Sequence, residues 1–325
     1  MYKHIHVIIN PASGADKPVL STLNDAFKSF DIDWDVLVTK KAGDARRYAK
    51  ESVAAGVDVV AVYGGDGTVM EAVTGIIGSD TPLAIFPGGT GNGAANELHI
   101  PIDLAQACAL LTGDDSEVRQ VDVGQIDDNY FLLNAGVGFA TAIMEGAERS
   151  AKDRLGLLAY FISGIQTLRD PPIAKYHLTL DGKVIELEGV SCLIANSGAV
   201  GSLGVRLASN INISDGLLDV VVIGNGDLGA MISVGASLLG GNEDAQPLQH
   251  WQAREITLVT DPPQTLQLDG NVMGSTPFTA RVVEKAARII VPKATVPVAE
   301  QEKPAESVTV SPSDAAPLTG APAAS

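Results

Sequence analysis

The stretch VVAVYGGDGTVMEAV, residues 59–73, sets the architecture of this chain, because it joins an apolar strand to a helix through a turn of glycines. The run VVAVY is short and rich in β-branched residues, which is typical of a strand buried on both faces of a parallel sheet. Glycines after such a strand let another group approach the backbone closely, and the helix that follows offers free N–H donors. The turn that contains Gly64 and Gly65 is therefore predicted to bind a phosphate.

Asp66 stands in the middle of this turn, and its carboxylate would repel a phosphate unless a cation lay between the two. A nucleotide with bound Mg2+ resolves the conflict, because the glycine N–H groups hold the phosphates while the carboxylate faces the metal or its water ligands. The alternative is that Asp66 only caps the next helix. For a single GDG turn the capping interpretation is favoured.

A second turn of the same design favours phosphate binding over the capping interpretation. The stretch FPGGTGNGAANEL, residues 86–98, again places a strand, a double glycine, a hydroxyl residue and a helix in that order. Gly89, Thr90 and Asn92 of this turn join the candidate phosphate-binding residues. The turn also fits the GxGxxG/A pattern of dinucleotide-binding proteins, but the acidic residue expected about 20 positions later would fall in a loop, GDDSE. The chain contains no GxxxxGK[ST] sequence, so a P-loop is excluded.

The predicted elements divide the chain into two parts and a tail. Strands and helices alternate at first, which predicts a parallel sheet covered on both faces with its ligand at the carboxyl ends of the strands. Later, short strands joined by Gly, Pro, Asn and Asp turns predict an antiparallel β-sandwich. We expect residues 1–120 to form a nucleotide-binding α/β domain completed by 281–293, and residues 121–280 to form a substrate-binding sandwich. The Ala/Pro/Ser-rich tail, 294–325, is expected to be disordered.

Hydrophobic periodicity places the individual elements. The predicted strands of the first part are 4–10, 34–39, 57–63 and 82–87, and its predicted helices are 17–30, 43–56, 68–77, 93–100 and 104–113. The helix over 17–30 is expected to bury one apolar side, made of Val19, Leu20, Leu23, Phe27 and Phe30. In the second part, an apolar helix at 154–168 and a candidate helix near 227–240 interrupt the strands.

Composition and charge narrow the function classes. The 325 residues carry a net charge of −17, which argues against nonspecific binding to nucleic acid. Cys108 and Cys192 stand alone in apolar surroundings and are predicted to be core thiols in a reducing compartment. We see no secretory signal and no run of the ~20 apolar residues that a membrane span needs, and so expect a cytoplasmic protein. His4 and His6 have no ligand-spaced partner, so no chemistry is assigned to them.

Seven motifs in order resemble the diacylglycerol kinase catalytic domain, which bacterial lipid kinases, diacylglycerol kinases, ceramide kinases and sphingosine kinases share. They are NPASG (10–14), GGDGTVMEAVTG (64–75), PGGTGNG (87–93), VDVG (121–124), NAGVGFAT (134–141), SDGLLDVVVI (214–223) and LQLDGN (266–271). Together they extend over essentially everything before the tail. The resemblance implies a nucleotide-binding α/β domain and a β-sandwich domain, with ATP and a lipid meeting in the cleft between them.

The resemblance also implies roles for particular residues. It implies ATP contacts from Asn10, Ser13, Thr39, Gly65, Asp66, Gly67, Thr68, Glu71 and Thr90. It implies that Asp66 and Asp122 belong to a Mg2+–water network at the active site. It further implies a structural Mg2+ site, made by the Asp215 carboxylate with the backbone carbonyls of Asn212 and Leu217. Asp215 taken alone could equally be a turn residue.

Two positions depart from the family pattern. The late motif normally reads DGE, with the glutamate as general base, whereas this chain has Asp269-Gly270-Asn271. Asparagine cannot accept a proton at neutral pH, and the loss of a general base costs about 10²–10⁴ in rate. We therefore expect Asp66 to act as the base, with slower catalysis through Asp269 as the other route. Gly93 stands where bacterial members usually have Asp, which weakens a specific assignment to diacylglycerol.

The sequence thus predicts an ATP- and Mg2+-dependent lipid kinase that phosphorylates the hydroxyl of a diacylglycerol-like or sphingoid-like lipid. Its expected partners are the lipid alcohol and, transiently, the inner face of the membrane. Asn271 motivates an alternative, a nucleotide- or lipid-binding protein that has lost catalysis. An NAD kinase, which shares GGDGT, is a further alternative, although NPASG and LQLDGN match the lipid kinases better.

Overall fold

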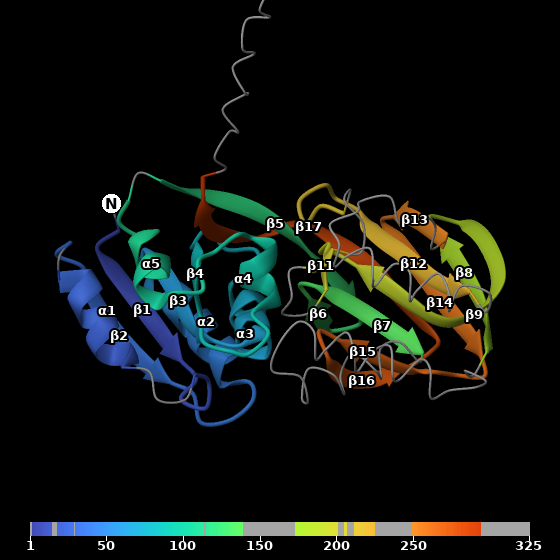
Figure 1. The fold of residues 1–325 in the computed structure, drawn as a ribbon, viewed down its shortest axis with the longest axis horizontal. Helices are drawn as coiled ribbons and strands as arrows, with labels where there is room; N and C mark the ends of the chain where they lie inside the picture. The colour runs from blue at the N-terminus through green and yellow to red at the C-terminus, as the bar shows by residue number, and fades with distance from the viewer. Residues whose placement is uncertain are drawn as a thin grey trace, which may run out of the picture. The chain divides into compact units, whose positions relative to one another are not determined.

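Four parallel strands form the amino-terminal sheet in the spatial order β4, β3, β1, β2 (Figure 1). They are β1 (His4–Ile9), β2 (Asp33–Val38), β3 (Val59–Gly64) and β4 (Leu83–Pro87). Every residue of β3 and β4 is buried, as their uninterrupted apolar runs predict. The computed structural model describes residues 2–14, 18–28, 30–113, 115–138, 173–200, 205–206, 211–224 and 249–293.

Helices alternate with these strands along the chain. They are α1 (Val19–Lys28), α2 (Asp44–Ala55), α3 (Asp66–Ile76), α4 (Gly93–Glu97) and α5 (Leu104–Ala109). Leu23 and Phe27 of α1 are buried, but Leu20 is 56% exposed and Phe30 is 37% exposed, so the buried side of this helix is narrower than predicted. α4 and α5 are also shorter than predicted. His99 adopts a left-handed backbone conformation (φ 58°) just beyond α4, which stops that helix.

The register between β1 and β2 overturns the prediction that the two amino-terminal histidines lack a partner. His6 and Asp35 are directly opposite each other in the parallel pair. The Asp35 Oδ2 atom lies 3.4 Å from His4 Nε2 and 3.5 Å from His6 Nε2. Sequence spacing could not show this, because Asp35 belongs to a neighbouring strand that α1 separates from β1.

The second part of the chain is built from antiparallel strands around a separate hydrophobic cluster. Its strands are β5 (Ser116–Ile126), β6 (Asn129–Phe131), β7 (Asn134–Gly138), β8 (Ala174–Leu180), β9 (Lys183–Ala195), β10 (Ala199–Val200), β11 (Val205–Arg206), β12 (Leu218–Gly224), β13 (Gln249–Ala253), β14 (Glu255–Asp261), β15 (Thr265–Leu268), β16 (Asn271–Ser275) and β17 (Phe278–Pro292). The main path runs β16, β15, β7, β9, β8, β14, β17, and all of these neighbours are antiparallel. This is the predicted β-sandwich pattern.

β17 connects the two parts. Its first residues pair with β14, its length pairs with β5, and Ile289 near its end pairs in parallel with Leu83 of β4. The pairing with β5 is interrupted by a bulge between Val283 and Ala287, where Lys285 has a φ of 52°. Residues 1–293 accordingly form one compact unit. The hydrogen-bonded network thus passes from the amino-terminal sheet into the sandwich through one strand.

Some predicted features can be checked directly and others lie outside the described residues. Cys108 and Cys192 are buried free thiols, as predicted, and burial raises the pKa of each to about 12. Within the described ranges, no helix is both long and apolar enough to cross a membrane. The predicted helices at 154–168 and 227–240 and the tail at 294–325 are not among the described residues.

Candidate active site

A pocket of about 860 Å³ lies beyond the carboxyl ends of β1, β2 and β3. Both parts of the chain line it. The first part contributes Asn10, Pro11, Ala12, Thr39, Lys40, Lys41, Ala42, Gly43, Ala45, Arg46, Gly67, Thr68, Met70, Glu71 and Thr74, and the second contributes Asp128, Asn129, Tyr130, Leu268, Asp269, Asn271, Val272 and Met273. Ligand pockets for small molecules measure about 300–1,000 Å³. The position at the strand ends is the one that the sequence predicts.

The two glycine turns pack against each other through their backbones. The Gly88 N–H donates to the Gly64 carbonyl oxygen at 2.9 Å. A Cβ atom on Gly89 would lie 2.6 Å from the Cα of Gly65, and one on Gly64 would lie 2.6 Å from the Cβ of Thr68. Glycine is therefore needed at Gly89 for packing between the two turns, and at Gly64 for packing against the first turn of α3, in addition to any ligand contact.

Gly67 differs from these glycines because it is exposed in the first turn of α3. A Cβ atom on Gly67 would meet no atom within 4 Å. Gly67 and Thr68 line the pocket, and the first N–H groups of a helix have no intrahelical acceptor. The amino end of α3 therefore presents donors and open space to the pocket.

The NPASG turn is anchored to this helix. The Asn10 Nδ2 donates to the Thr68 Oγ1 at 2.9 Å, while the Asn10 Oδ1 accepts from the Ala12 N–H at 3.0 Å. Ser13 donates its backbone N–H to the Asn10 carbonyl oxygen at 3.1 Å and does not line the pocket. A Cβ atom on Gly14, which has a φ of 67°, would collide with the Tyr63 hydroxyl. The turn is thus held rigidly beside the strand end.

Glu71 caps a neighbouring helix. Its Oε1 accepts from the Gly43 N–H at 2.8 Å and its Oε2 accepts from the Ala45 N–H at 3.1 Å. Gly43, the N-cap of α2, has no side chain of its own with which to satisfy these donors. Glu71 was expected to contact the nucleotide; it lines the pocket, but both carboxylate oxygens are engaged by the start of α2.

Three cations in the pocket wall were not among the predicted site residues. Lys40 and Lys41 follow Thr39 just after the end of β2, and Arg46 lies in the first turn of α2. The pair of lysines next to Thr39 was the sequence signal that could have identified this segment. Thr39 itself is buried at the pocket wall, and its backbone N–H donates to the Ile9 carbonyl oxygen at 2.9 Å.

Asp66 and Asp269 form an acidic pair beside the pocket. The Asp66 Oδ1 accepts from the Ala94 N–H, at the start of α4, at 3.1 Å. Burial raises the pKa of Asp269 to about 6, and the charge of Asp66 acts in the same direction. Three backbone N–H groups oppose this rise, donated by Leu132, Leu133 and Asn134 at 2.8–3.0 Å. The two parts of the chain therefore each contribute one carboxylate to the same electrostatic site.

Gly91 and Gly93 leave room for the Asp66 carboxylate. A Cβ atom on Gly91 would lie 2.9 Å from the Asp66 Oδ2. A Cβ atom on Gly93 would lie 2.7 Å from the Leu133 Cδ1 and 3.7 Å from the Asp66 Oδ1. The departure at Gly93 is thus matched by its surroundings, because a larger acidic residue there would crowd Leu133 and add a like charge beside Asp66.

The second glycine turn is closed by its own side chain. The Gly89 N–H donates to the Asn92 Oδ1 at 2.9 Å, and the Asn92 Nδ2 donates to the Gly89 carbonyl oxygen at 2.8 Å. Thr90 is exposed. Neither Thr90 nor Asn92 belongs to the pocket lining. The structure therefore gives Asn92 a clear part in shaping the turn.

Asp122, which the resemblance assigns to a Mg2+–water network together with Asp66, makes its hydrogen bonds away from the pocket lining. Its Oδ2 accepts from the Gly216 N–H at 2.7 Å and its Oδ1 accepts from the Lys285 N–H at 2.6 Å. The residue is 1% exposed and is not among the residues that line the pocket. Asp122 instead fastens the loop before β12 and the bulge of β17, because buried carboxylates need such donors.

The predicted metal loop, residues 212–217, lies beside Asp122. The Asp215 Oδ1 accepts from the Leu217 N–H at 3.0 Å, and the Asn212 Oδ1 accepts from the Ser214 N–H at 3.1 Å. Partial burial raises the pKa of Asp215, and the charges of Asp219 and Asp122 raise it further. Such a gathering of carboxylates suits a divalent cation.

Asn271 stands at the start of β16, opposite Leu268 of β15. Asn271 is exposed and lines the pocket. It occupies the position of the glutamate in the DGE motif, two residues after Asp269. The structure therefore brings together in the pocket lining Asn10, Thr39, Gly67, Thr68, Glu71, Asp269 and Asn271. It leaves out of that lining Ser13, Gly64, Gly65, Asp66, Gly89, Thr90, Asn92, Asp122, Asn212, Asp215 and Leu217.

Comparison with known proteins agrees with this arrangement. Residues 4–126 match the family model of the diacylglycerol kinase catalytic domain, and residues 134–291 match that of the YegS C-terminal NAD kinase beta sandwich-like domain. A diacylglycerol kinase from Bacillus subtilis is 28% identical over 298 residues, which are 90% of this chain and 97% of that protein. An uncharacterised protein from Synechocystis sp. is 29% identical over 305 residues, 88% of this chain and 70% of that protein.

A solved structure supports the same relationship. The crystal structure of a diacylglycerol kinase from Bacillus anthracis matches with a TM-score of 0.75 and 28% identity, covering 91% of this chain and 99% of that one. Fold and matches together define a kinase with an α/β catalytic domain followed by a β-sandwich. The chain belongs to the diacylglycerol kinase catalytic-domain family.

Proposed function

We propose that this chain is an ATP-dependent lipid kinase, which transfers the γ-phosphate of ATP to the hydroxyl group of a lipid alcohol. The observation that carries the proposal is the pocket, which sets Lys40, Lys41 and Arg46 beside the amino end of α3 in a chain of net charge −17. Cations gathered at one place in an acidic protein indicate an anionic ligand. The substrate class comes from relatives named diacylglycerol kinase.

The triphosphate is proposed to lie against the first turn of α3. Gly67 leaves space there for a close approach to the backbone, and free N–H groups and the helix dipole favour negative charge. Asn10 and Thr68 hold each other in position at the same wall, and the two lysines supply opposite charge. Thr39 and Glu71 define the wall towards α2.

Mg2+ fits the acidic pair near this turn, because it prefers carboxylate and phosphate oxygens as ligands. The charge of Asp66 adds to the effect of burial in raising the pKa of Asp269, and a divalent cation would offset that effect. The ion would neutralise part of the phosphate charge. A second ion fits the loop of Asp215, where the charges of Asp122 and Asp219 already disfavour ionisation.

Asp66 is the proposed acceptor of the lipid hydroxyl proton. In the described part of the chain it accepts one backbone N–H, whereas Asp269 accepts three. Asp66 therefore keeps more lone pairs for a substrate. Asp269 is proposed to position the 132–134 segment and to hold negative charge near the reacting groups, and Asn271 is proposed to hydrogen-bond the substrate hydroxyl.

A direct assay tests the proposal. Purified full-length chain is mixed with Mg2+, labelled ATP and a panel of lipid alcohols that includes diacylglycerol, phosphatidylglycerol and a sphingoid base. We expect label in at least one lipid, and a rate about 10²–10⁴ lower for Asp66→Asn, as for the loss of a general base. Asp127→Asn, in an exposed turn where the residue has a φ of 52°, is the matched control and should keep full activity. Absence of transfer to every acceptor would refute the proposal.

A second candidate, a nucleotide-binding protein without catalysis, is favoured by Asn271 at the pocket wall. ATP binding by calorimetry without turnover, with turnover appearing in Asn271→Glu, would establish it in place of the kinase. NAD+ belongs in the acceptor panel because the sandwich is of the NAD kinase-like type. Phosphorylation of NAD+ in preference to all lipids would replace the lipid proposal.

A further inference from the structure

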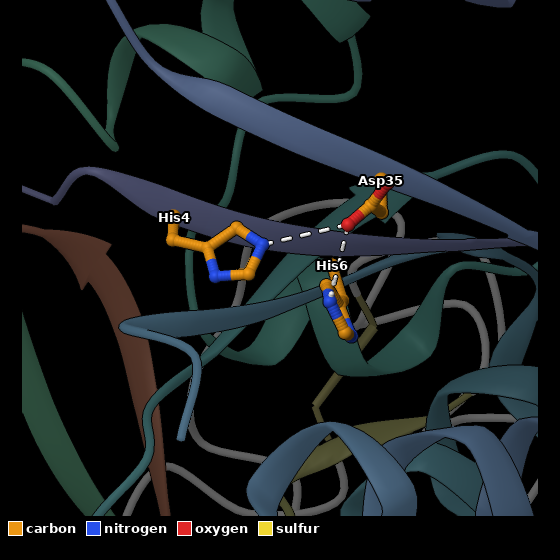
Figure 2. A group of neighbouring side chains, drawn as sticks. All are labelled: His4, His6 and Asp35. Carbon is orange, nitrogen blue, oxygen red and sulfur yellow. Dashed lines mark hydrogen bonds and ion pairs between the residues drawn. The ribbon is translucent and has the colours of Figure 1, made fainter. Parts of the chain in front are cut away.

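A cluster of two histidines and one carboxylate lies on the amino-terminal sheet (Figure 2). None of the three residues belongs to the pocket lining. His4 and His6 project from β1 on the same face, as residues two apart on a strand do. Asp35 comes from β2, and Figure 2 shows its carboxylate directed to both rings. One donor atom of each residue lies within 4.8 Å of the others.

Ser52 of α2 sets the orientation and tautomer of the His6 ring. The Ser52 Oγ lies 2.8 Å from the His6 Nδ1 and 2.8 Å from the Tyr48 carbonyl oxygen. A hydroxyl has one hydrogen, and the Tyr48 carbonyl can only accept it, so Ser52 must accept from the His6 Nδ1–H. A neutral His6 then carries its lone pair on Nε2, the atom 3.5 Å from the Asp35 Oδ2.

That lone pair faces an anionic oxygen with no proton between them. In this neutral form, the lone pair of His6 and the carboxylate of Asp35 repel each other unless a cation binds to both. An imidazole whose Nδ1–H is fixed by a hydrogen bond and whose Nε2 is free is the usual state of a metal ligand.

We propose that His4, His6 and Asp35 bind one divalent transition-metal cation of the zinc class. Tetrahedral Zn2+ has bonds of about 2.0–2.1 Å to imidazole nitrogen and carboxylate oxygen, which places neighbouring ligand atoms about 3.3–3.4 Å apart. The distances of 3.4 and 3.5 Å from Asp35 Oδ2 to the two Nε2 atoms are close to that separation. Two imidazole nitrogens select Zn2+, Cu2+ or Ni2+ over Mg2+. Three protein ligands leave a coordination position for water or a small anion.

A metal bound at this site would link the edge strand β2 to its neighbour β1. β2 is the last strand in the order and pairs with β1, and its residues are mostly exposed. A metal bound by both strands, with His6 supported by α2 through Ser52, would hold β2 against β1 and α2. The described contacts of the cluster do not involve Asp66, Asp269 or the pocket lining, so the proposal stands independently of the kinase assignment.

The experiment uses the full-length chain without a polyhistidine tag, stripped of metal by a chelator and kept in excess Mg2+ to occupy oxygen-rich sites. Zn2+ is titrated by calorimetry, and Co2+ is titrated by visible absorption, which reports tetrahedral nitrogen and oxygen coordination. We expect one Zn2+ per chain, and an affinity at least about tenfold weaker for His4→Ala and for Asp35→Asn. Both side chains are well exposed, at 41% and 68%, so these variants should fold normally.

His177→Ala provides the matched control. His177 in β8 also lies beside one carboxylate, with its Nδ1 atom 3.2 Å from the Glu186 Oε1. Among the described residues, however, it does not belong to a group of three potential metal ligands. It should leave Zn2+ affinity unchanged, whereas Ser52→Ala should weaken it about 10–100-fold by releasing His6. Zn2+ affinity that is unchanged in both His4→Ala and Asp35→Asn would overturn the proposal. Absence of Zn2+ binding by the wild-type chain would also overturn it. Added Zn2+ should also raise the melting temperature of the wild type and not of His4→Ala.

Discussion

Individual glycines at the candidate active site differ in why they must be glycine. A Cβ atom on Gly89 would lie 2.6 Å from the Cα of Gly65, a distance that real Cβ atoms essentially never show. A Cβ atom on Gly67 would meet nothing within 4 Å. Gly89 is therefore required by the packing of two turns, whereas Gly67 stays open towards the pocket.

These surroundings predict opposite outcomes for the same substitution. We expect Gly67→Ala to keep the fold, because alanine is favoured over glycine in a helix by about 1 kcal/mol, but to weaken ATP binding about tenfold by filling phosphate space. Gly89→Ala should lower the free energy of unfolding by about 1–3 kcal/mol through overpacking. Thermal unfolding and ATP calorimetry measure the two effects. Unchanged ATP affinity in Gly67→Ala would remove Gly67 from the phosphate site.

The raised pKa of Asp269 should make the free energy of unfolding depend on pH. Its pKa is about 6 in the folded chain against an ordinary value of 3.8, so between these values the folded state holds a proton that the unfolded state has released. The stability contribution of Asp269 is therefore present below about pH 4 and is lost as pH rises through about 6. In urea unfolding, the wild type should lose stability relative to Asp269→Asn across this window. A constant difference would show that Asp269 titrates normally.

At the scale of elements, α2 depends on a side chain from another helix. The carboxylate of Glu71 in α3 satisfies the N–H groups of Gly43 and Ala45, which α2 cannot satisfy by itself. Sequence reasoning assigned Glu71 to the nucleotide, because a glutamate near a glycine turn has no local feature that reveals a distant helix end. The Asp44 carboxylate at the start of α2 also accepts from the backbone N–H groups of Lys40 and Lys41, and so holds the loop that carries these lysines into the pocket wall.

The hairpin of β15 and β16 presents apolar side chains at the pocket. Val272 is 60% exposed and Met273 is 45% exposed, and both line the pocket. We propose that this strand contacts the membrane from which the lipid is taken. Val272→Asp should weaken binding to phospholipid vesicles several-fold, because a charge replaces buried apolar area at the bilayer surface. Cosedimentation with vesicles measures this binding.

Val184→Asp is the control for the hairpin. Val184 in β9 is 64% exposed, close to the value for Val272, but it does not line the pocket. Its replacement should leave vesicle binding unchanged. Equal losses in the two variants would indicate a general charge effect and would refute a specific role for β16.

At the scale of the whole molecule, β17 makes the two hydrophobic clusters interdependent. It pairs with β14 in the sandwich and reaches β4 of the amino-terminal sheet, and β5 runs along it on the other side. Both carboxylates of the acidic pair need this connection, because Asp66 belongs to one part and Asp269 to the other. The pocket exists only while the two parts remain joined.

This connection predicts cooperative unfolding, which the two tryptophans can report separately. Trp34 packs against the first cluster and Trp251 against the second. We expect Trp34→Phe and Trp251→Phe, each with one remaining tryptophan, to give fluorescence transitions that coincide with the loss of circular dichroism within each variant. A fluorescence midpoint that departs from the dichroism midpoint in either variant would show that the two parts unfold independently.

Much of the fold could be predicted from short stretches of the sequence. The strands β1 to β4, the helices that alternate with them and the change to a sandwich follow from apolar periodicity and turn residues, which act over a few neighbouring positions. The glycine turns also identified the correct end of the sheet, because parallel strands place their carboxyl ends together. The late LQLDGN motif singled out Asp269, which lines the pocket, and the GGDG turn singled out Asp66, whose charge acts on Asp269.

Other features depended on contacts between distant segments. The backbone N–H groups of Gly216 and Lys285, from two remote segments, both donate to the Asp122 carboxylate, and local sequence does not reveal these contacts. The register of β1 with β2 brought Asp35 to His4 and His6, and β17 joined the two parts into one unit. Local sequence thus settled the type and order of the elements, since these follow from short-range preferences. The partner of each charged group was settled only by folding, because burial makes a carboxylate accept whichever donor the tertiary structure supplies.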